Sequence, residues 1–151
     1  MMCVKLKDGL WIGDAESSQN LEELEKNHIS WIVNCAGREL DNHFPHLRYL
    51  TFSWDDAADF VLFDAGGVVL EQICSFVDDG LRAGESVLLH DVMGGSRCVA
   101  ASVAYFLARY GWSLEKALAF HQAKQHEQKL EALEGRFPGR DVLLEVAQSN
   151  R

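Results

Sequence analysis

A short stretch in the middle of the chain combines glycines, a serine and an arginine between a strand pattern and a helix pattern. Residues 87–90 are apolar enough for a short buried strand, and the apolar spacing over 97–110 predicts a helix. The connecting residues are Asp91, Val92, Met93, Gly94, Gly95 and Ser96, and Arg97 follows them. A loop before a helix N-terminus gathers free N–H groups where the helix dipole favours negative charge. Because the Arg97 guanidinium adds a planar pair of donors, the stretch predicts a site for a phosphate-like anion.

The spacing of His90, Gly94 and Arg97 resembles the signature loop of cysteine-dependent protein phosphatases, His-Cys-x-x-Gly-x-x-Arg-Ser/Thr, in their dual-specificity branch. Two positions depart from that signature. Asp91 stands where the nucleophilic cysteine belongs, and Cys98 stands where a serine or threonine follows the arginine. The resemblance implies a phosphate loop without its nucleophile, as in inactive STYX-type pseudophosphatases, with His90 as structural support for the loop.

The resemblance covers most of the chain, from about residue 4 to residue 145, and includes the phrases at 10–14, 28–35 and 103–117. It implies an α/β, cysteine-phosphatase-like fold with a central, mostly parallel five-stranded sheet flanked by helices. The loop is then expected at the carboxyl end of the central strand. Alternating strand and helix patterns along the chain favour the same fold class.

The general acid of this family has a counterpart in the acidic segment after Trp54. Asp56 matches the usual position best, and Asp55 and Asp59 remain alternatives because the gap to the loop is longer than usual. In a working enzyme this acid protonates the leaving oxygen after a thiolate attacks phosphorus. Without the thiolate, the three residues equally fit an acidic loop in water.

Asp91 is a poor replacement for a thiolate. Two unit charges about 4 Å apart repel by roughly 1–4 kcal/mol, so its carboxylate opposes a phosphate dianion in the same loop. We expect the carboxylate to occupy the loop itself, on its N–H groups, and Arg97 to form an internal ion pair with Asp91 or with another carboxylate. The thiol of Cys98 is a second possible nucleophile, but its place in the first turn of the helix directs it away from the loop.

Three interpretations of function follow from the residues. The first is a pseudophosphatase, not an enzyme, that serves as a protein-interaction or scaffolding module. The second is an adaptor that binds phosphorylated partners through Arg97. The third is an active phosphatase whose nucleophilic cysteine has been replaced by Asp91 through engineering.

Composition limits the remaining possibilities. The 151 residues are 48% hydrophobic, which suits one domain over 1–151 with a substantial core. A net charge of −9 argues against binding to nucleic acid, and no apolar run is long enough to span a membrane. The four scattered cysteines suit a reducing, cytoplasmic location. No cofactor or metal is expected, because His121 and His126 lack the four-residue spacing of paired ligands.

The patterns that position the loop are local. We expect strands at 4–6, 10–12, 29–35 and 49–54, with a hairpin turn at 7–9. Helices are expected from the N-cap Asp14 to about residue 26, over 68–82, from the N-cap Ser113 into the charged run 124–134, and over 141–148.

Overall fold

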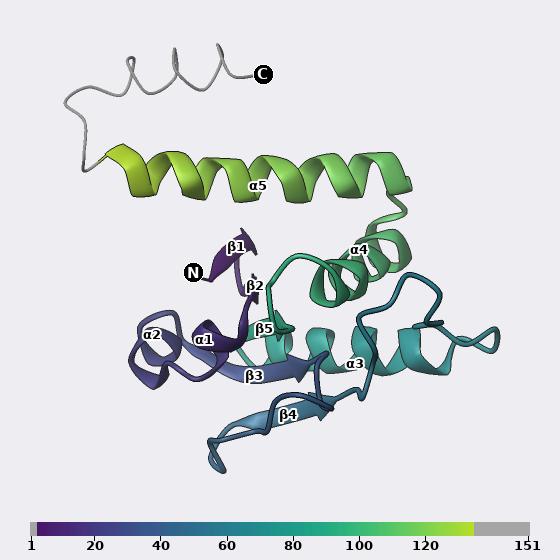
Figure 1. Ribbon diagram of the computed structural model, residues 1–151, viewed down its shortest axis with the longest axis horizontal. Coiled ribbons are helices and arrows are strands. Elements are labelled where there is room, and N and C mark those ends of the chain that lie inside the picture. The colour runs from purple at the N-terminus through teal and green to yellow at the C-terminus, as the bar shows by residue number, and fades with distance from the viewer. Residues whose placement is uncertain (1–2, 135–151) are drawn as a thin grey trace.

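The fold is built on one five-stranded sheet (Figure 1). The computed structural model describes residues 3–134, with side chains up to residue 128. The strands are β1 (Val4–Lys7), β2 (Leu10–Gly13), β3 (Ile29–Asn34), β4 (Arg48–Thr51) and β5 (Ser86–His90). Their order is β1-β2-β5-β3-β4, and every pair is parallel except the β1–β2 hairpin. The predicted fold class is confirmed, and β5 is the central strand.

The helices cover both faces of this sheet. Those of the described residues are α1 (Ala15–Ser18), α2 (Leu21–Lys26), α3 (Val68–Arg82), α4 (Arg97–Tyr110) and α5 (Leu114–Glu134). Helices α1 and α2 pack on one face, α3 and α4 pack on the other, and α5 lies across α4 and β1 (Figure 1). Within the described part of the chain, no helix is both long and apolar enough to cross a membrane.

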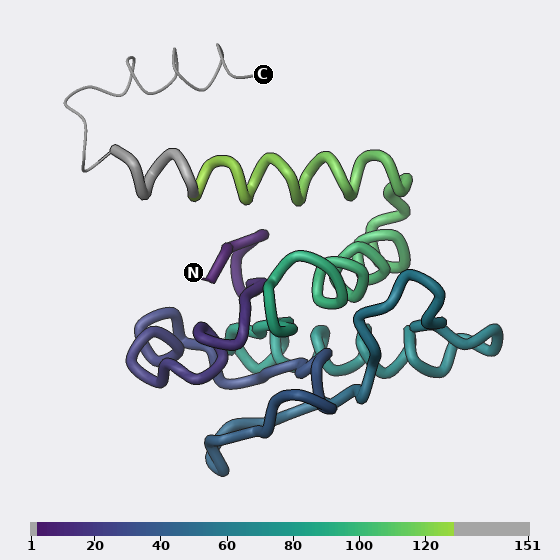
Figure 2. The backbone as a smooth tube through the Cα atoms, viewed as in Figure 1, coloured from purple at the N-terminus to yellow at the C-terminus, as the bar shows by residue number. Residues whose placement is uncertain are grey.

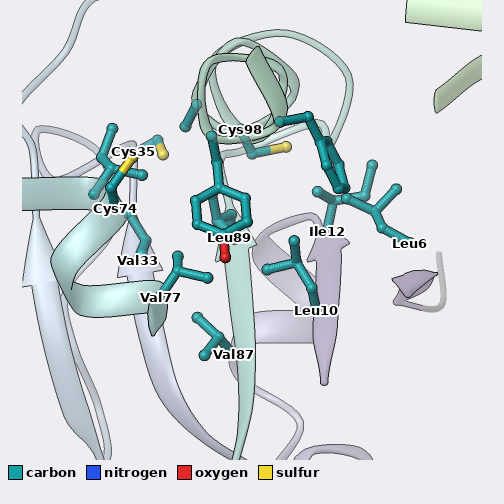
Figure 3. Close-up of a cluster of buried hydrophobic side chains, with 14 of the residues drawn as sticks. Leu6, Leu10, Ile12, Val33, Cys35, Cys74, Val77, Val87, Leu89 and Cys98 are labelled. Carbon is teal, nitrogen blue, oxygen red and sulfur yellow. The ribbon is translucent and has the colours of Figure 1, made fainter. Parts of the chain in front are cut away.

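The central strand is buried on both faces, which explains its continuous apolar sequence. Val87 and Leu89 point toward α3 and α4, whereas Leu88 joins the smaller core under α2 with Leu24 and Ile32. Figure 3 shows the larger core, where Leu89 lies among side chains from neighbouring strands and from both helices. This packing fixes the end of β5, and therefore the start of the loop that follows it.

Two elements differ from the sequence predictions by more than one residue at an end. The first helix is broken after Ser18, because the Asn20 side chain accepts the N–H of Glu23 and starts α2 as a separate helix. Strand β4 ends at Thr51, although Trp54 beyond it is buried. The helix after Ser113 runs through the charged segment to Glu134, in agreement with the prediction, and the predicted helix over 141–148 lies outside the described residues.

Candidate functional site

The predicted anion loop, residues 91–96, leaves the carboxyl end of β5 and enters α4 (Figure 2). Two backbone hydrogen bonds fix it to the β2–α1 turn: Asp91 N–H donates to the Gly13 carbonyl at 3.4 Å, and Ala15 N–H donates to the Val92 carbonyl at 3.0 Å. Gly94 has a φ of 82°, a left-handed conformation that residues with a Cβ disfavour. The loop therefore turns its N–H groups inward, as the sequence pattern predicts.

The carboxylate of Asp91 lies on those inward N–H groups. Its Oδ1 accepts the N–H of Gly94, and its Oδ2 accepts the N–H of Cys98 at 3.0 Å and of Ser96 at 3.3 Å. The side chain is 2% exposed. A buried carboxylate is stable here because its charge is met by several amide donors at a helix N-terminus. The loop thus holds an anion that belongs to the chain itself.

The guanidinium of Arg97 is held by a carboxylate other than Asp91. Its Nη1 contacts both carboxylate oxygens of Glu39, at 3.1 and 3.2 Å, and donates to the Trp54 carbonyl at 2.9 Å. Arg97 is 4% exposed, whereas the Glu39 side chain is 44% exposed. Of the two partners that the sequence left open for Arg97, Asp91 or another carboxylate, the structure therefore shows the second.

Glu39 is the site residue that sequence reasoning missed. It lies 58 residues before Arg97, in a polar segment between β3 and β4 that carries no motif. Only the fold brings this segment to the loop. The Arg97 guanidinium also retains one buried donor, Nε, without a hydrogen-bond partner.

The three candidate general acids lie just beyond the Trp54 carbonyl that Arg97 contacts. Asp56 and Asp59 are exposed to solvent. Asp55 forms an ion pair with Arg38 at 2.6 Å, and Arg38 also donates to the Ser53 carbonyl. The structure thus places the acidic segment next to Arg97 and leaves the Asp56 carboxylate in water.

His90 is buried directly beneath the loop. Its Nδ1 lies 3.3 Å from the Asp91 carbonyl, and its own carbonyl accepts the N–H of Cys35 at 2.9 Å. Burial lowers the pKa of the His90 imidazole, and this effect outweighs the opposing charges of Asp91 and Asp14. A neutral imidazole at this point fits the supporting role that the resemblance implies.

Comparison with known proteins identifies the family of the chain. Residues 10–132 match the family described as "Dual specificity phosphatase, catalytic domain". The chain belongs to this dual specificity phosphatase family. It is 38% identical over 112 residues to protein phosphatase Slingshot homolog 3 of Mus musculus, a match that covers 72% of this chain and 16% of that protein. The chain thus spans about a sixth of the length of that relative.

Solved structures show the same fold. The human tyrosine phosphatase-like serine/threonine/tyrosine-interacting protein superposes with a TM-score of 0.74 at 24% identity, covering 83% of this chain and 85% of that one. A mouse putative dual specificity phosphatase, solved as a complex with zinc tungstate, superposes with a TM-score of 0.70 at 22% identity, covering 89% of each chain. Both likenesses show that the chain has the fold of dual specificity phosphatases.

Cys98 is not positioned as a substitute nucleophile for this phosphatase fold. Its side chain is fully buried, and its Sγ donates to the Gly13 carbonyl at 3.8 Å. Burial and the nearby Asp91 carboxylate raise the pKa of the Cys98 thiol well above its usual value. The thiol therefore stays protonated and packed in the core between α4 and the sheet.

His121 takes a structural role on α5. Its Nδ1 lies 2.8 Å from the Ala117 carbonyl, which only accepts, so Nδ1 carries the proton and Nε2 accepts from the Ser102 hydroxyl. The side chains of Ser102 and His121 are both buried, and the hydrogen bond between them attaches α5 to α4. In the described part of the chain, no three His, Cys, Asp or Glu side chains are grouped to hold a metal ion.

Proposed function

We propose that this chain is a pseudophosphatase, a catalytically inactive dual specificity phosphatase domain that acts as a protein-interaction or scaffolding module. The observation that carries the proposal is the Asp91 carboxylate, which accepts three N–H groups from within the loop and the first turn of α4. In a working member of the family these donors would stabilise the charge of the transferring phosphoryl group. Here the same donors are used to hold the fold together.

The chemistry at Asp91 argues against turnover. A thiolate would attack phosphorus in line and leave again as a stable anion, whereas both oxygens of Asp91 are engaged in hydrogen bonds. An incoming phosphate dianion would also meet this negative charge inside a buried site, where charge repulsion is screened less than in water. The carboxylate is therefore a competitor of phosphate rather than a nucleophile for it.

Glu39 adds a second obstacle. Its carboxylate occupies Nη1 of Arg97, the side chain that would pair with the phosphate oxygens. Both sets of donors, the loop amides and the guanidinium, are thus partly satisfied by carboxylates of the same chain. This arrangement supports a domain that no longer needs to admit a substrate.

A phosphate-release assay tests the proposal. The full chain, at high concentration with para-nitrophenyl phosphate, should release phosphate no faster than Asp91→Ala prepared in parallel. Turnover that scales with protein concentration and disappears in Asp91→Ala would overturn the proposal. A native circular dichroism spectrum of the variant at the assay temperature would show that the comparison concerns chemistry and not folding.

One observation favours a second candidate, an adaptor that binds phosphorylated partners. The Nε donor of Arg97 is buried without a hydrogen-bond partner, and such a group gains when an anion reaches it. Calorimetry with phosphotyrosine and phosphothreonine peptides, and with tungstate as a phosphate-like oxyanion, separates the two candidates. Heat from phosphopeptides that disappears in Arg97→Gln supports the adaptor, whereas no heat at about 1 mM supports the self-occupied loop.

Partners and location follow as parts of the same proposal. Protein partners, some of them phosphorylated in the adaptor interpretation, fit a domain whose loop is occupied. The four cysteines are reduced and buried, which suits a cytoplasmic location in which thiols stay reduced.

A further inference from the structure

An apolar groove runs along α4 and α5 beside the phosphate loop. We call it the α4–α5 groove; it has a volume of about 420 Å³, reaches Ser96 of the loop, and is lined by Phe63, Val99, Val103, Leu107, Leu114 and Leu118. Leu114 and Leu118 are 56% and 42% exposed, unusual for large apolar side chains on one helix face. Exposed apolar surface of this kind gains free energy when a partner covers it.

The walls of this groove favour a helical occupant. Two of them are α4 and α5, whose backbone N–H and C=O groups are already paired within each helix. A partner therefore finds no strand edge to extend, and its own backbone groups need internal partners once water is displaced. A helix meets that need and offers apolar side chains at helical spacing to the groove.

The charges beside the groove favour a basic partner. Phe63 belongs to the acidic loop 55–64, in which Asp56, Asp59 and Asp64 are exposed. Between Arg48 and Arg82 the chain has seven acidic residues and no lysine or arginine. Asp55 is paired with Arg38, so Asp56, Asp59 and Asp64 carry the negative charge of the loop. An excess of one sign next to an apolar surface attracts and orients a ligand of the opposite sign.

We propose that the α4–α5 groove binds an amphipathic helix of a protein partner. Its leucine or phenylalanine side chains fill the groove, and its lysine or arginine side chains face the acidic loop 55–64. This inference rests on the interaction role proposed above, but it is independent of the chemistry at Asp91, because the apolar side chains of the groove make no hydrogen bond to that residue.

Synthetic peptides of about 18 residues, five helical turns, test the proposal. The probe is a fluorescein-labelled peptide with leucines on one helical face and lysines on the other. Controls are the same peptide with glutamates for the lysines, and a shuffled peptide of identical composition. Fluorescence anisotropy with the full chain should give a dissociation constant of about 1–100 μM for the probe, and much weaker binding for both controls.

Matched variants locate the binding site on α5. Leu118→Glu should weaken binding at least about tenfold, because it places a charge in the apolar contact. Ala119→Glu adds the same charge at the next position of α5, which is exposed and does not line the groove, and should change affinity by less than about twofold. Asp59→Lys should weaken binding of the lysine peptide and strengthen binding of the glutamate peptide.

Other outcomes overturn the proposal. No binding at about 1 mM peptide, equal binding of the glutamate peptide, or equal losses in Leu118→Glu and Ala119→Glu would each do so. Sedimentation showing a dimer that Leu118→Glu dissociates would assign the groove to a second copy of the chain instead. Phosphate release in the aryl-phosphate assay would overturn the inactivity of the loop and leave the peptide result untouched.

Discussion

At the scale of single residues, one carboxylate occupies the loop between β5 and α4. Asp91 keeps the spacing to Gly94 and Arg97 of the signature that the loop resembles, and Gly94 takes the left-handed conformation that closes the loop. The oxygens of Asp91 then take the N–H groups that this closure gathers. The Asp91 carboxylate, which is longer and bulkier than a cysteine thiol, thereby fills the centre of the loop.

The two obstacles to phosphate should be separable by mutation. Asp91→Cys restores the family's nucleophile and should give only weak hydrolysis of para-nitrophenyl phosphate, because Glu39 still occupies Arg97. The double variant Asp91→Cys, Glu39→Gln removes that charge and should raise kcat/KM by up to about tenfold, equivalent to at most about 1.4 kcal/mol in the transition state. Steady-state kinetics of both variants measures the difference.

The matching control is Glu39→Gln with Asp91 unchanged, which should remain inactive. Equal kcat/KM for the single and double variants would show that Glu39 moves aside without cost. The exposure of the Glu39 side chain, 44%, limits the effect, since water screens this ion pair.

At the scale of elements, local patterns predicted the strand, loop and helix of the site but not the other segments of the chain that contact them. The apolar run of β5 and the periodicity of α4 are properties of neighbouring residues, and they placed Asp91 and Arg97 at the two ends of one loop. Glu39 could not be found in this way, because its contact with Arg97 depends on how β3 and β4 are ordered in the sheet. The break before α2 was missed because the N-cap Asn20 lies inside a continuous helical pattern.

The attachment of α5 to α4 depends on a buried hydrogen bond between Ser102 and His121. Ser102→Ala should lower the free energy of unfolding by about 1–3 kcal/mol, because Nε2 of His121 becomes a buried acceptor without a donor. Urea denaturation of the full chain measures the loss. The double variant Ser102→Ala, His121→Leu replaces both partners by apolar groups and should recover much of it; a double variant as unstable as the sum of the single ones would contradict this account.

At the scale of the whole molecule, the acidic composition shapes the surface more than the fold. The net charge of −9 arises partly from the acidic region between Arg48 and Arg82. The core, by contrast, is built from the same alternating apolar pattern that predicted an α/β sheet. The fold class could therefore be predicted from the sequence, because it depends on the apolar pattern. The proposed α4–α5 groove could not, because it depends on how α4 and α5 pack together in the fold.

Two buried imidazoles tie the stability of the whole fold to pH. Burial lowers the pKa values of His90 and His121 below the value of 6.5 expected in the unfolded chain. As the pH falls through 6.5, the unfolded chain therefore binds protons that the folded chain resists, and the free energy of unfolding decreases, by at most about 1.4 kcal/mol per pH unit for each histidine. Above 6.5 these two residues leave stability unchanged.

Melting temperatures between about pH 7.5 and pH 5 measure this decrease. The exposed carboxylates of Asp8 and Asp64, whose pKa values are lowered from 3.8 by their local partners, lose their favourable contacts only in more acidic solution and do not overlap this window. His121→Leu should flatten the decrease, whereas His43→Asn, at an exposed position, should preserve it. A melting temperature independent of pH across this range would mean that both imidazoles accept protons without cost in the folded chain. That result would contradict the argument from burial, because His90 and His121 are each only 2% exposed.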